Sequence, residues 1–366
     1  MTPATTNFYY EGPHRSESTA KEWDLSSRLE TTDPANQARR VLAEFPPKYQ
    51  PESLRLIDRQ GFSGAQIFQV KTSIGDFALR AWPSNGPEIQ RLRALHRLLS
   101  HIFSRGVENI PVPILSSQSS SVVEMFARHW QLEPWMPGKS TFHDNPSDAR
   151  LVDVMKCLAS WHNAAADFSE AKCFETKQGE SPGIVARAEQ LKKLKSSLSR
   201  RLDVKRMNAP QDFVLVVNDT LQQFELLADK IARQLTFASN LQVRCQPCIR
   251  DIWHDNLLFT EDRLTGIVDF GAAMSDNIAI DLARCLGSLL GDDKSRWDTA
   301  INQYQQLRQL SNDELTLIEV FDQANVLLSG TTWIFRFLNG EQQLASDKRV
   351  IDRMQMFLDR MKQLPT

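Results

Sequence analysis

The residues of this chain whose types and spacing could do chemistry lie together in one short stretch. Asp251 follows an apolar run, and Asn256 comes five residues later. Two short β-favouring runs, residues 257–259 and 266–268, flank a polar turn and predict a hairpin, which Asp269 follows at once. The pattern thus places two carboxylates and an amide at neighbouring strand ends. Phosphoryl transfer from ATP needs such a set, with a base or orienting group for the attacking hydroxyl and two oxygen ligands for Mg²⁺.

Asp251-x4-Asn256 followed by Asp269-Phe270-Gly271 resembles the catalytic and metal-binding segments of the protein-kinase-like superfamily. The nearer resemblance is to the aminoglycoside phosphotransferase and choline kinase family of small-molecule kinases, whose hairpin is similarly short. This resemblance implies an α+β, two-lobed protein-kinase-like fold. Its small N-lobe would be a five-stranded antiparallel sheet with one helix, and its larger C-lobe would be mainly helical. The resemblance also implies that Asp251 is the catalytic base or orienter, and that Asn256 and Asp269 hold the metal.

The composition excludes several classes of partner. A formal charge of −2 over 366 residues gives no general attraction to nucleic acid or to an anionic membrane. No apolar run reaches membrane-spanning length, and the first residues lack a secretory pattern. Five cysteines, an odd number, predict reduced thiols and a cytoplasmic location. Cys245-x-x-Cys248 is compatible with zinc or redox chemistry, but no second pair accompanies it, which favours buried strand cysteines.

The predicted lobes follow from how polar, apolar and turn-forming residues are distributed along the chain. Residues 1–36 are polar and predict an N-terminal extension, although a short helix is expected from Pro34 to Phe45. Residues 133–138 resemble a hinge, and residues 139–366 form the predicted C-lobe, with a helical insert at about 184–236. The strands predicted for the N-lobe, residues 37–132, are 54–57, 65–71, 76–82, 110–115 and 121–126, and a further strand that begins at Trp130 runs into the hinge.

The phosphate-binding residues are predicted from the same resemblance. A turn between two predicted strands carries Gly61, Ser63 and Gly64, whose N–H and hydroxyl groups would point at phosphates, although most such turns are only turns. Arg80 would grip the α- and β-phosphates, or else be an edge-strand arginine in solvent. Glu88 opens the next predicted helix, where it would pair with Arg80 or simply favour the helix N-terminus.

The hinge and the start of the C-lobe carry further expectations. The Glu133 carbonyl and the Trp135 N–H would hold adenine, although Trp135 is equally compatible with ordinary packing. His162 lies on an apolar helix face and is interpreted as a satisfied core residue. Asp281 matches a family motif in which an aspartate braces the catalytic loop from a helix start.

Two departures from the family pattern precede Asp251. Ile249 and Arg250 stand where the family usually has His and Gly. An apolar residue can pack in place of an orienting histidine, and Arg250 would help to keep Asp251 ionised. Neither departure removes a metal ligand, but both affect the positioning of the base.

The predicted function is ATP- and Mg²⁺-dependent phosphorylation of a hydroxyl on a small molecule. The alternative is a nucleotide-binding regulatory protein of the same fold with impaired catalysis. A protein kinase is disfavoured because only nine residues separate Gly271 from Asp281, too few for a peptide-docking segment. A basic run at residues 192–206 is either a solvated helix face or an indication that the acceptor is neutral or anionic.

Overall fold

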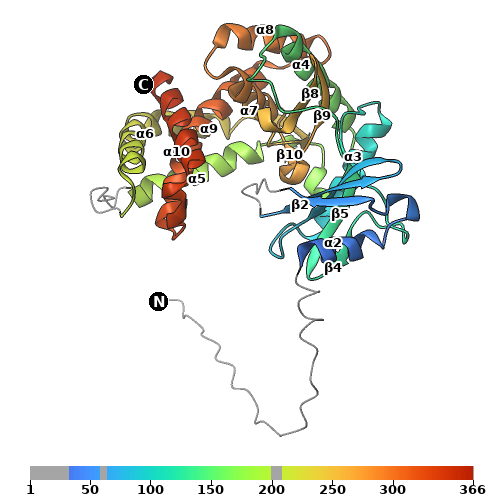
Figure 1. Cartoon of the computed structure of the whole chain (residues 1–366). Helices are drawn as coiled ribbons and strands as arrows, with labels where there is room; N and C mark the ends of the chain where they lie inside the picture. Colours follow the sequence, from blue (N-terminus) through green and yellow to red (C-terminus); the bar gives the residue numbers. More distant parts are fainter. Residues whose placement is uncertain (1–32, 58–63, 199–207, 366) are drawn as a thin grey trace, which may run out of the picture.

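The computed structural model describes residues 33–57, 64–198 and 208–365, which form two lobes (Figure 1). The N-lobe is built on a five-stranded antiparallel sheet in the order β1-β2-β3-β5-β4. The α+β, two-lobed prediction is confirmed. The strands are β1 (Ser53–Leu56), β2 (Gln66–Thr72), β3 (Gly75–Ala81), β4 (Val123–Met125) and β5 (Arg128–Pro134).

The two faces of this sheet differ because side chains alternate along each strand. The apolar face, with Phe68, Leu79 and Leu132, packs against helix α2 (Pro34–Leu42). The opposite face carries the polar side chains of β3 and β5, including the paired residues Arg80 and Gln131. Helix α3 (Ile89–Ser104) contacts this polar face, since His96 of α3 bonds to Gln131.

One predicted strand is wrong. Residues 110–115 form no strand, and only Ile114 makes an isolated bridge, to Leu132 of β5. Pro111 and Pro113 have no N–H to donate, so this segment cannot complete a ladder. The fifth strand of the sheet is β5, which runs directly into the predicted hinge.

The connection between the lobes is tied to the catalytic hairpin. Lys139 and Phe259 exchange two backbone hydrogen bonds, at 3.0 and 2.8 Å. Gly138 precedes this contact with φ of +99°, and a Cβ there would lie 2.8 Å from the backbone of Phe259. Only glycine fits such a conformation at such a close approach.

The C-lobe is mainly helical, with two small sheets. Strands β6 (Lys177–Gly179), β7 (Val243–Cys248) and β10 (Met274–Asp276) form one sheet, in the order β10-β7-β6. The predicted hairpin is confirmed as β8 (Leu257–Thr260) and β9 (Arg263–Ile267). The long helices are α4 (Asp148–Ala165), α5 (Pro182–Leu198), α6 (Gln211–Ala238), α7 (Ala279–Leu290), α8 (Lys294–Gln305), α9 (Asn312–Leu338) and α10 (Lys348–Gln363).

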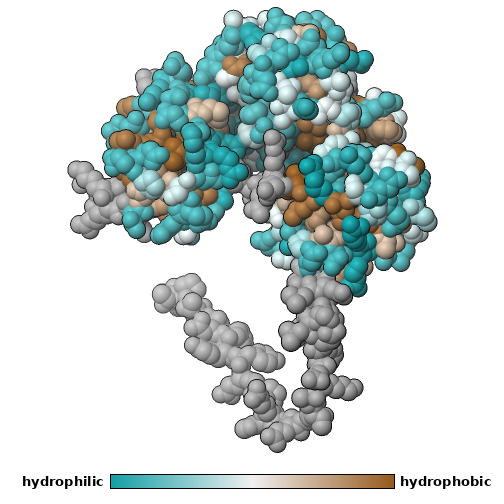
Figure 2. All heavy atoms as spheres, in the orientation of Figure 1, coloured by the Kyte–Doolittle hydropathy of each residue, from teal (hydrophilic) through white to brown (hydrophobic). Residues whose placement is uncertain are grey.

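Helix α9 is the central helix in the part of the C-lobe that lies far from the N-lobe sheet. It packs against α5, α6, α7 and α10, and Ser311 starts it with a capping box. Helices α5 and α6 coincide with the predicted insert. Figure 2 shows a hollow between the N-lobe and the group that contains α6 and α10. None of the described helices combines the length and apolar character needed to cross a membrane.

Candidate active site

The loop before Asp251 is held from below by a buried carboxylate. Asp281, at the start of α7, accepts hydrogen bonds from the backbone N–H groups of Ile249 at 2.7 Å and Arg250 at 2.6 Å. His162 of α4 contacts the same carboxylate at 3.0 Å and bonds to the Tyr304 hydroxyl through its other ring nitrogen. Burial lowers the pKa of His162, so the ring is neutral, donates from Nε2 to Asp281 and accepts from Tyr304. This arrangement fits the brace expected of Asp281 and the core role expected of His162.

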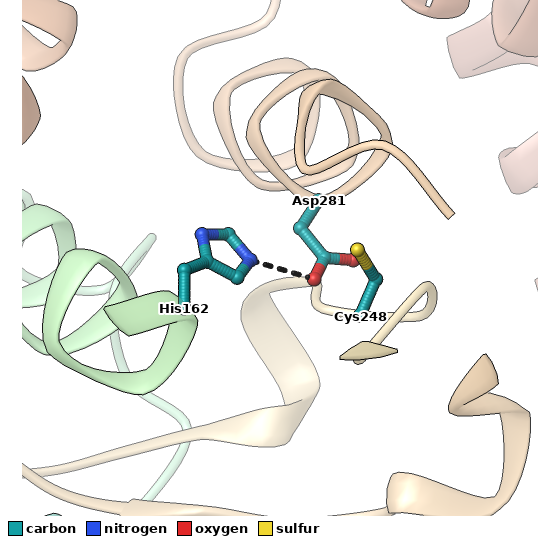
Figure 3. Close-up of side chains that lie close together, drawn as sticks. All are labelled: His162, Cys248 and Asp281. Carbon is teal, nitrogen blue, oxygen red and sulfur yellow. Dashed lines mark hydrogen bonds and ion pairs between the residues drawn. The ribbon is translucent and has the colours of Figure 1, made fainter. Parts of the chain in front are cut away.

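His162, Cys248 and Asp281 lie close enough together to raise the question of a metal site (Figure 3). Their chemistry argues against one. Both oxygens of Asp281 are engaged by backbone N–H groups, and the Cys248 thiol donates to the Asp276 carbonyl. Burial raises the pKa of Cys248 well above its ordinary value, so the thiol stays protonated and is a poor metal ligand. Cys245 and Cys248 are both buried on β7, as predicted.

Asp251 itself is half exposed and contacts an arginine that the sequence did not single out. Arg284 of α7 donates from Nε and Nη2 to Asp251 Oδ1, at 3.2 and 3.0 Å. The side chain of Arg250 instead approaches Asp276 at 3.7 Å and Met274, so among the described contacts the ion pair with Asp251 is made by Arg284 and not by Arg250.

The conformation of Arg250 explains what the family's glycine does at this position. Its φ is +68°, in the left-handed region that costs a residue with a Cβ about 1 kcal/mol. Two hydrogen bonds to Asp281 flank this turn and hold it against that cost. The departure from the family pattern therefore stores strain directly before Asp251.

The hairpin brings the two predicted metal ligands to one end. The Val268 N–H donates to the Asn256 carbonyl at 3.0 Å, which fixes Asn256 beside the residue that precedes Asp269. Asn256 Nδ2 donates to the Asp251 carbonyl at 3.0 Å, which leaves its Oδ1 as the atom able to bind a metal. Asp269 has φ of +64°, and its side chain is 43% exposed.

Arg80 connects the N-lobe to this end of the hairpin. Its Nη1 donates to Asp269 Oδ1 at 3.2 Å, and its Nη2 lies 3.8 Å from Glu133 Oε1. Arg80 is buried, which excludes the reading of an edge-strand arginine in solvent. The expected pairing with Glu88 is wrong, because Glu88 is exposed at the start of α3 and the acids that pair with Arg80 among the described residues are Glu133 and Asp269.

The Glu133 side chain belongs to a buried polar network. Gln131 Nε2 donates to Glu133 at 2.6 Å, while Gln131 Oε1 accepts from Trp82 at 2.8 Å and contacts His96 at 3.1 Å. The carboxylate that pairs with Arg80 therefore comes from Glu133 on β5 and not from Glu88 at the start of α3. Helix α3 contacts this network through His96. Burial raises the pKa of Glu133, and the charge of Arg80 opposes that shift.

The hinge contacts expected at Glu133 and Trp135 are also wrong. The Trp135 N–H donates to the Asp76 carbonyl at 3.0 Å, and Glu133 pairs with Ala78 in the same ladder. Backbone groups alternate between the two edges of a strand, so the sheet uses both predicted groups. By the same alternation, the carbonyl of Pro134 and the N–H of Met136 face the opposite edge, one residue further along than predicted.

The turn predicted to fold over phosphates lies partly outside the described residues, which omit Gly61 and Ser63. Gly64 is described and has φ of +70°, a conformation that favours glycine. A separate contact couples α3 to the end of the hairpin where metal binding is predicted. Arg91 Nη2 donates to the carbonyls of Gly271 at 2.8 Å and Ala273 at 3.1 Å.

Sequence reasoning missed Arg284, Arg91 and the Glu133 side chain. A signal for Arg284 was present, because it follows Asp281 by three residues and therefore shares its helix face. The alternation of β5 was the signal for Glu133, which lies two residues after Gln131 and so points to the same face. Arg91 carried no such signal.

Comparison with known proteins identifies related sequences. The model of the phosphotransferase enzyme family matches residues 54–317. Homoserine kinase from Methylocella silvestris is 25% identical over 254 residues, which are 66% of this chain and 68% of that protein. Homoserine kinase from Granulibacter bethesdensis is 22% identical over 282 residues, covering 74% of this chain and 78% of that protein.

Solved structures share the fold. Spectinomycin phosphotransferase, in complex with ADP and spectinomycin, aligns with a TM-score of 0.66 at 13% identity and covers 92% of this chain and 95% of that chain. Amicoumacin kinase, in complex with AMP-PNP, Ca²⁺ and Ami, aligns with a TM-score of 0.61 at 13% identity and covers 94% of this chain and 95% of that chain. Both bind a nucleotide, and the second also binds a divalent cation.

Proposed function

Since the chain belongs to the phosphotransferase enzyme family and is a small-molecule kinase, we propose that it transfers the γ-phosphoryl group of ATP to a hydroxyl, with Asp251 as the base or orienting group. One observation carries the proposal. Arg80 of the N-lobe contacts Asp269 of the C-lobe, beside a hairpin end that also holds Asn256. The residues that we propose to bind phosphate and metal, which come from the two lobes, thus lie next to the catalytic loop.

The residues at this end suit Mg²⁺. An amide oxygen of Asn256 and a carboxylate of Asp269 are hard oxygen ligands, and an incomplete protein ligand set is usual where substrate phosphates complete the shell. When bound, the metal would neutralise charge on the β- and γ-phosphates. Arg80 would then exchange its bond with Asp269 for bonds to phosphate, while Glu133 keeps it in place.

The nucleotide would enter the cleft from the opposite edge of β5. Adenine would meet the Pro134 carbonyl and the Met136 N–H, the groups that the sheet does not use. Gly61, Ser63 and Gly64 would cover the phosphates, as the sequence predicts. Among the described residues, Glu88 does not pair with Arg80, so a role for it in nucleotide binding would act through the start of α3.

The transfer then depends on the two oxygens of Asp251. Arg284 holds Oδ1, which leaves Oδ2 to accept the proton of the acceptor hydroxyl. As the hydroxyl oxygen bonds to the γ-phosphorus, the bond from that phosphorus to the bridging oxygen breaks and ADP leaves. Arg284 orients Asp251 through these two hydrogen bonds, and Asp281 would fix the loop so that the free oxygen is correctly placed.

The acceptor class is drawn from the relatives. Homoserine kinases and antibiotic phosphotransferases both phosphorylate hydroxyl groups on small molecules, so a small hydroxyl compound is the proposed substrate. Residues 199–207 of the basic run lie outside the described structure, and Lys195 pairs with Asp229 at the surface. The predicted link between that run and the acceptor therefore falls mainly on residues outside the described structure.

Turnover of ATP against a library of hydroxyl compounds tests the proposal. We expect Mg²⁺-dependent formation of ADP with at least one acceptor, and a phosphate ester identified by mass spectrometry. A protein that binds MgATP tightly and transfers phosphate neither to an acceptor nor to water would instead be the regulatory alternative. A protein that does not bind MgATP would contradict both.

A further inference from the structure

Four arginines lie in or near the catalytic loop, and we call them the arginine cluster: Arg187, Arg250, Arg284 and Arg353. They come from α5, the catalytic loop, α7 and α10. In Figure 1 these three helices lie on the same side of β10, and each packs against α9. Elements far apart in sequence therefore contribute these cations, and the charges of Arg250 and Arg284 act on Arg187 while that of Arg284 acts on Arg353.

Two members of the cluster share an aromatic ring. The guanidinium carbon of Arg353 lies 4.0 Å from the centre of the Trp253 ring, and that of Arg284 lies 5.3 Å from the same ring. Trp253 follows Asp251 by two residues. The ring holds both guanidinium groups near the base through cation–π contacts, although two cations on one ring also repel each other.

The other two members meet at Asp276. Arg250 lies 3.7 Å from this carboxylate. Gly183, which binds Arg187, approaches the same carboxylate so closely that a Cβ on Gly183 would lie 2.4 Å from Asp276 Oδ2. The Gly183 carbonyl accepts from Arg187 at 3.0 Å, and Asn325 Oδ1 accepts from the same guanidinium at 2.7 Å. The hydrogen-bond acceptors that the described residues give to Arg187 are thus neutral oxygens, while Arg250 has a carboxylate.

The charges of the cluster act on one another. Burial lowers the pKa of Arg187 to about 10, Asp276 opposes that shift, and the charges of Arg250 and Arg284 add to it. Burial also lowers the pKa of Arg353, with the charge of Arg284 as the next cause. The acids that act on these arginines or contact their backbone are Asp251, Asp255, Asp276 and Asp281, and burial raises the pKa of Asp276.

We propose that the arginine cluster binds an anionic group of the acceptor, a carboxylate or a phosphate, positioned a few bonds from the hydroxyl that Asp251 orients. The inference rests on the proposed function and names its substrate class. Arg284 uses two of its five N–H donors on Asp251, which leaves others for an anion at the adjacent position. A guanidinium fork suits both carboxylate and phosphate, and it does not suit an ammonium group.

This substrate class differs from that of a polycationic antibiotic. Several ammonium groups would need carboxylates around them, and here they would meet convergent arginines. A hydroxy acid or a phosphorylated alcohol would relieve the mutual repulsion of the cluster on binding. The acceptor thus supplies the charge that completes the site.

Binding of malonate and of inorganic phosphate, used as probes for the two anion types, tests the proposal without requiring the true acceptor. The protein is saturated with MgADP so that its nucleotide-phosphate site is filled, and each probe is titrated by calorimetry against sodium chloride at equal ionic strength. We expect saturable binding of at least one probe. Arg353→Gln and Arg187→Gln should each raise its dissociation constant at least fivefold.

Arg349→Gln is the matched control, because Arg349 is exposed on the same helix as Arg353 and should leave probe binding unchanged. Circular dichroism checks that each variant is folded, and Arg353→Lys retains charge if Arg353→Gln does not fold. The proposal is overturned if neither probe binds more tightly than chloride, or if the cluster variants and the control bind alike. A different result would overturn the proposed function alone. In that case the protein would not bind MgADP, while the probes would still bind as expected without MgADP, both in the wild type and in Arg80→Gln.

Discussion

The substitution Asp281→Asn removes the brace under the catalytic loop while leaving Asp251 and both predicted metal ligands in place. Asp281 Oδ2 accepts from Ile249 and His162, and Oδ1 accepts from Arg250. An asparagine keeps one acceptor oxygen. Its best orientation preserves the two bonds to Oδ2 and turns an NH₂ group toward the Arg250 N–H.

The magnitude follows from these contacts. A buried N–H without an acceptor costs about 1–3 kcal/mol, and the two remaining bonds lose the strengthening that the charge gives them, roughly 1 kcal/mol in all. We therefore expect the free energy of unfolding to fall by about 2–4 kcal/mol. Arg250, freed from its left-handed conformation, would relax and move Asp251, and a shift of about 1 Å at a catalytic group costs on the order of 100-fold in kcat.

Urea unfolding and steady-state kinetics measure these effects, together with the affinity for MgATP, which should change little. Asp298→Asn is the control, because Asp298 is exposed on α8 and the same chemical change there should leave stability and turnover unaltered. Unfolding free energy and kcat within experimental error of the wild type would refute the brace. A large loss of MgATP affinity would show instead that the substitution disturbs the whole site.

The remaining predictions concern the nucleotide side and the pH dependence of stability. Asp269→Ala should abolish Mg²⁺-dependent ATP binding because the main anionic ligand is lost, and unchanged MgATP affinity by calorimetry would contradict this. Glu133→Gln should leave Arg80 less well positioned and raise the KM for ATP about tenfold, which corresponds to about 1.4 kcal/mol. Glu88→Gln should leave this KM unchanged, and equal effects of the two substitutions would contradict the assignment of Glu133 as the partner of Arg80. Burial lowers the pKa of His96 from 6.5 to about 4, so the unfolded state binds the proton first as pH falls and stability is lost between those values. His96→Gln should therefore reduce the slope of unfolding free energy between pH 6.5 and pH 4 by up to about 1.4 kcal/mol per pH unit, and an unchanged slope in urea unfolding would contradict this.

The sequence predicted the fold and the family because those features depend on local patterns. Asp251, Asn256 and Asp269 come at fixed spacings around one hairpin, and alternating apolar residues predict the flanking strands. The family and the two-lobed fold are confirmed. The chemical roles of the three residues remain predictions that the experiments above address.

The errors arose where partners are set by three-dimensional packing. The alternation of β5 places Glu133 on the polar face of the sheet. The local sequence does not indicate that Arg80 pairs with Glu133 and not with Glu88 on the next helix, because β5 is about 50 residues away. The hinge error was one of register, since a shift of one residue turns each backbone group to the other edge of the strand. The strand predicted at 110–115 failed because its prolines were given too little weight.

Rapid-quench measurement of a single turnover tests the central claim most directly. With enzyme in excess over γ-labelled ATP and an acceptor identified by the screen, the wild type should transfer the label to the acceptor hydroxyl. Asp251→Asn should bind MgATP with nearly unchanged affinity and transfer the label on the order of 100-fold or more slowly, as expected for loss of a proton-accepting group. Transfer by Asp251→Asn at the wild-type rate would contradict the claim that this loop, braced by Asp281, carries the chemistry.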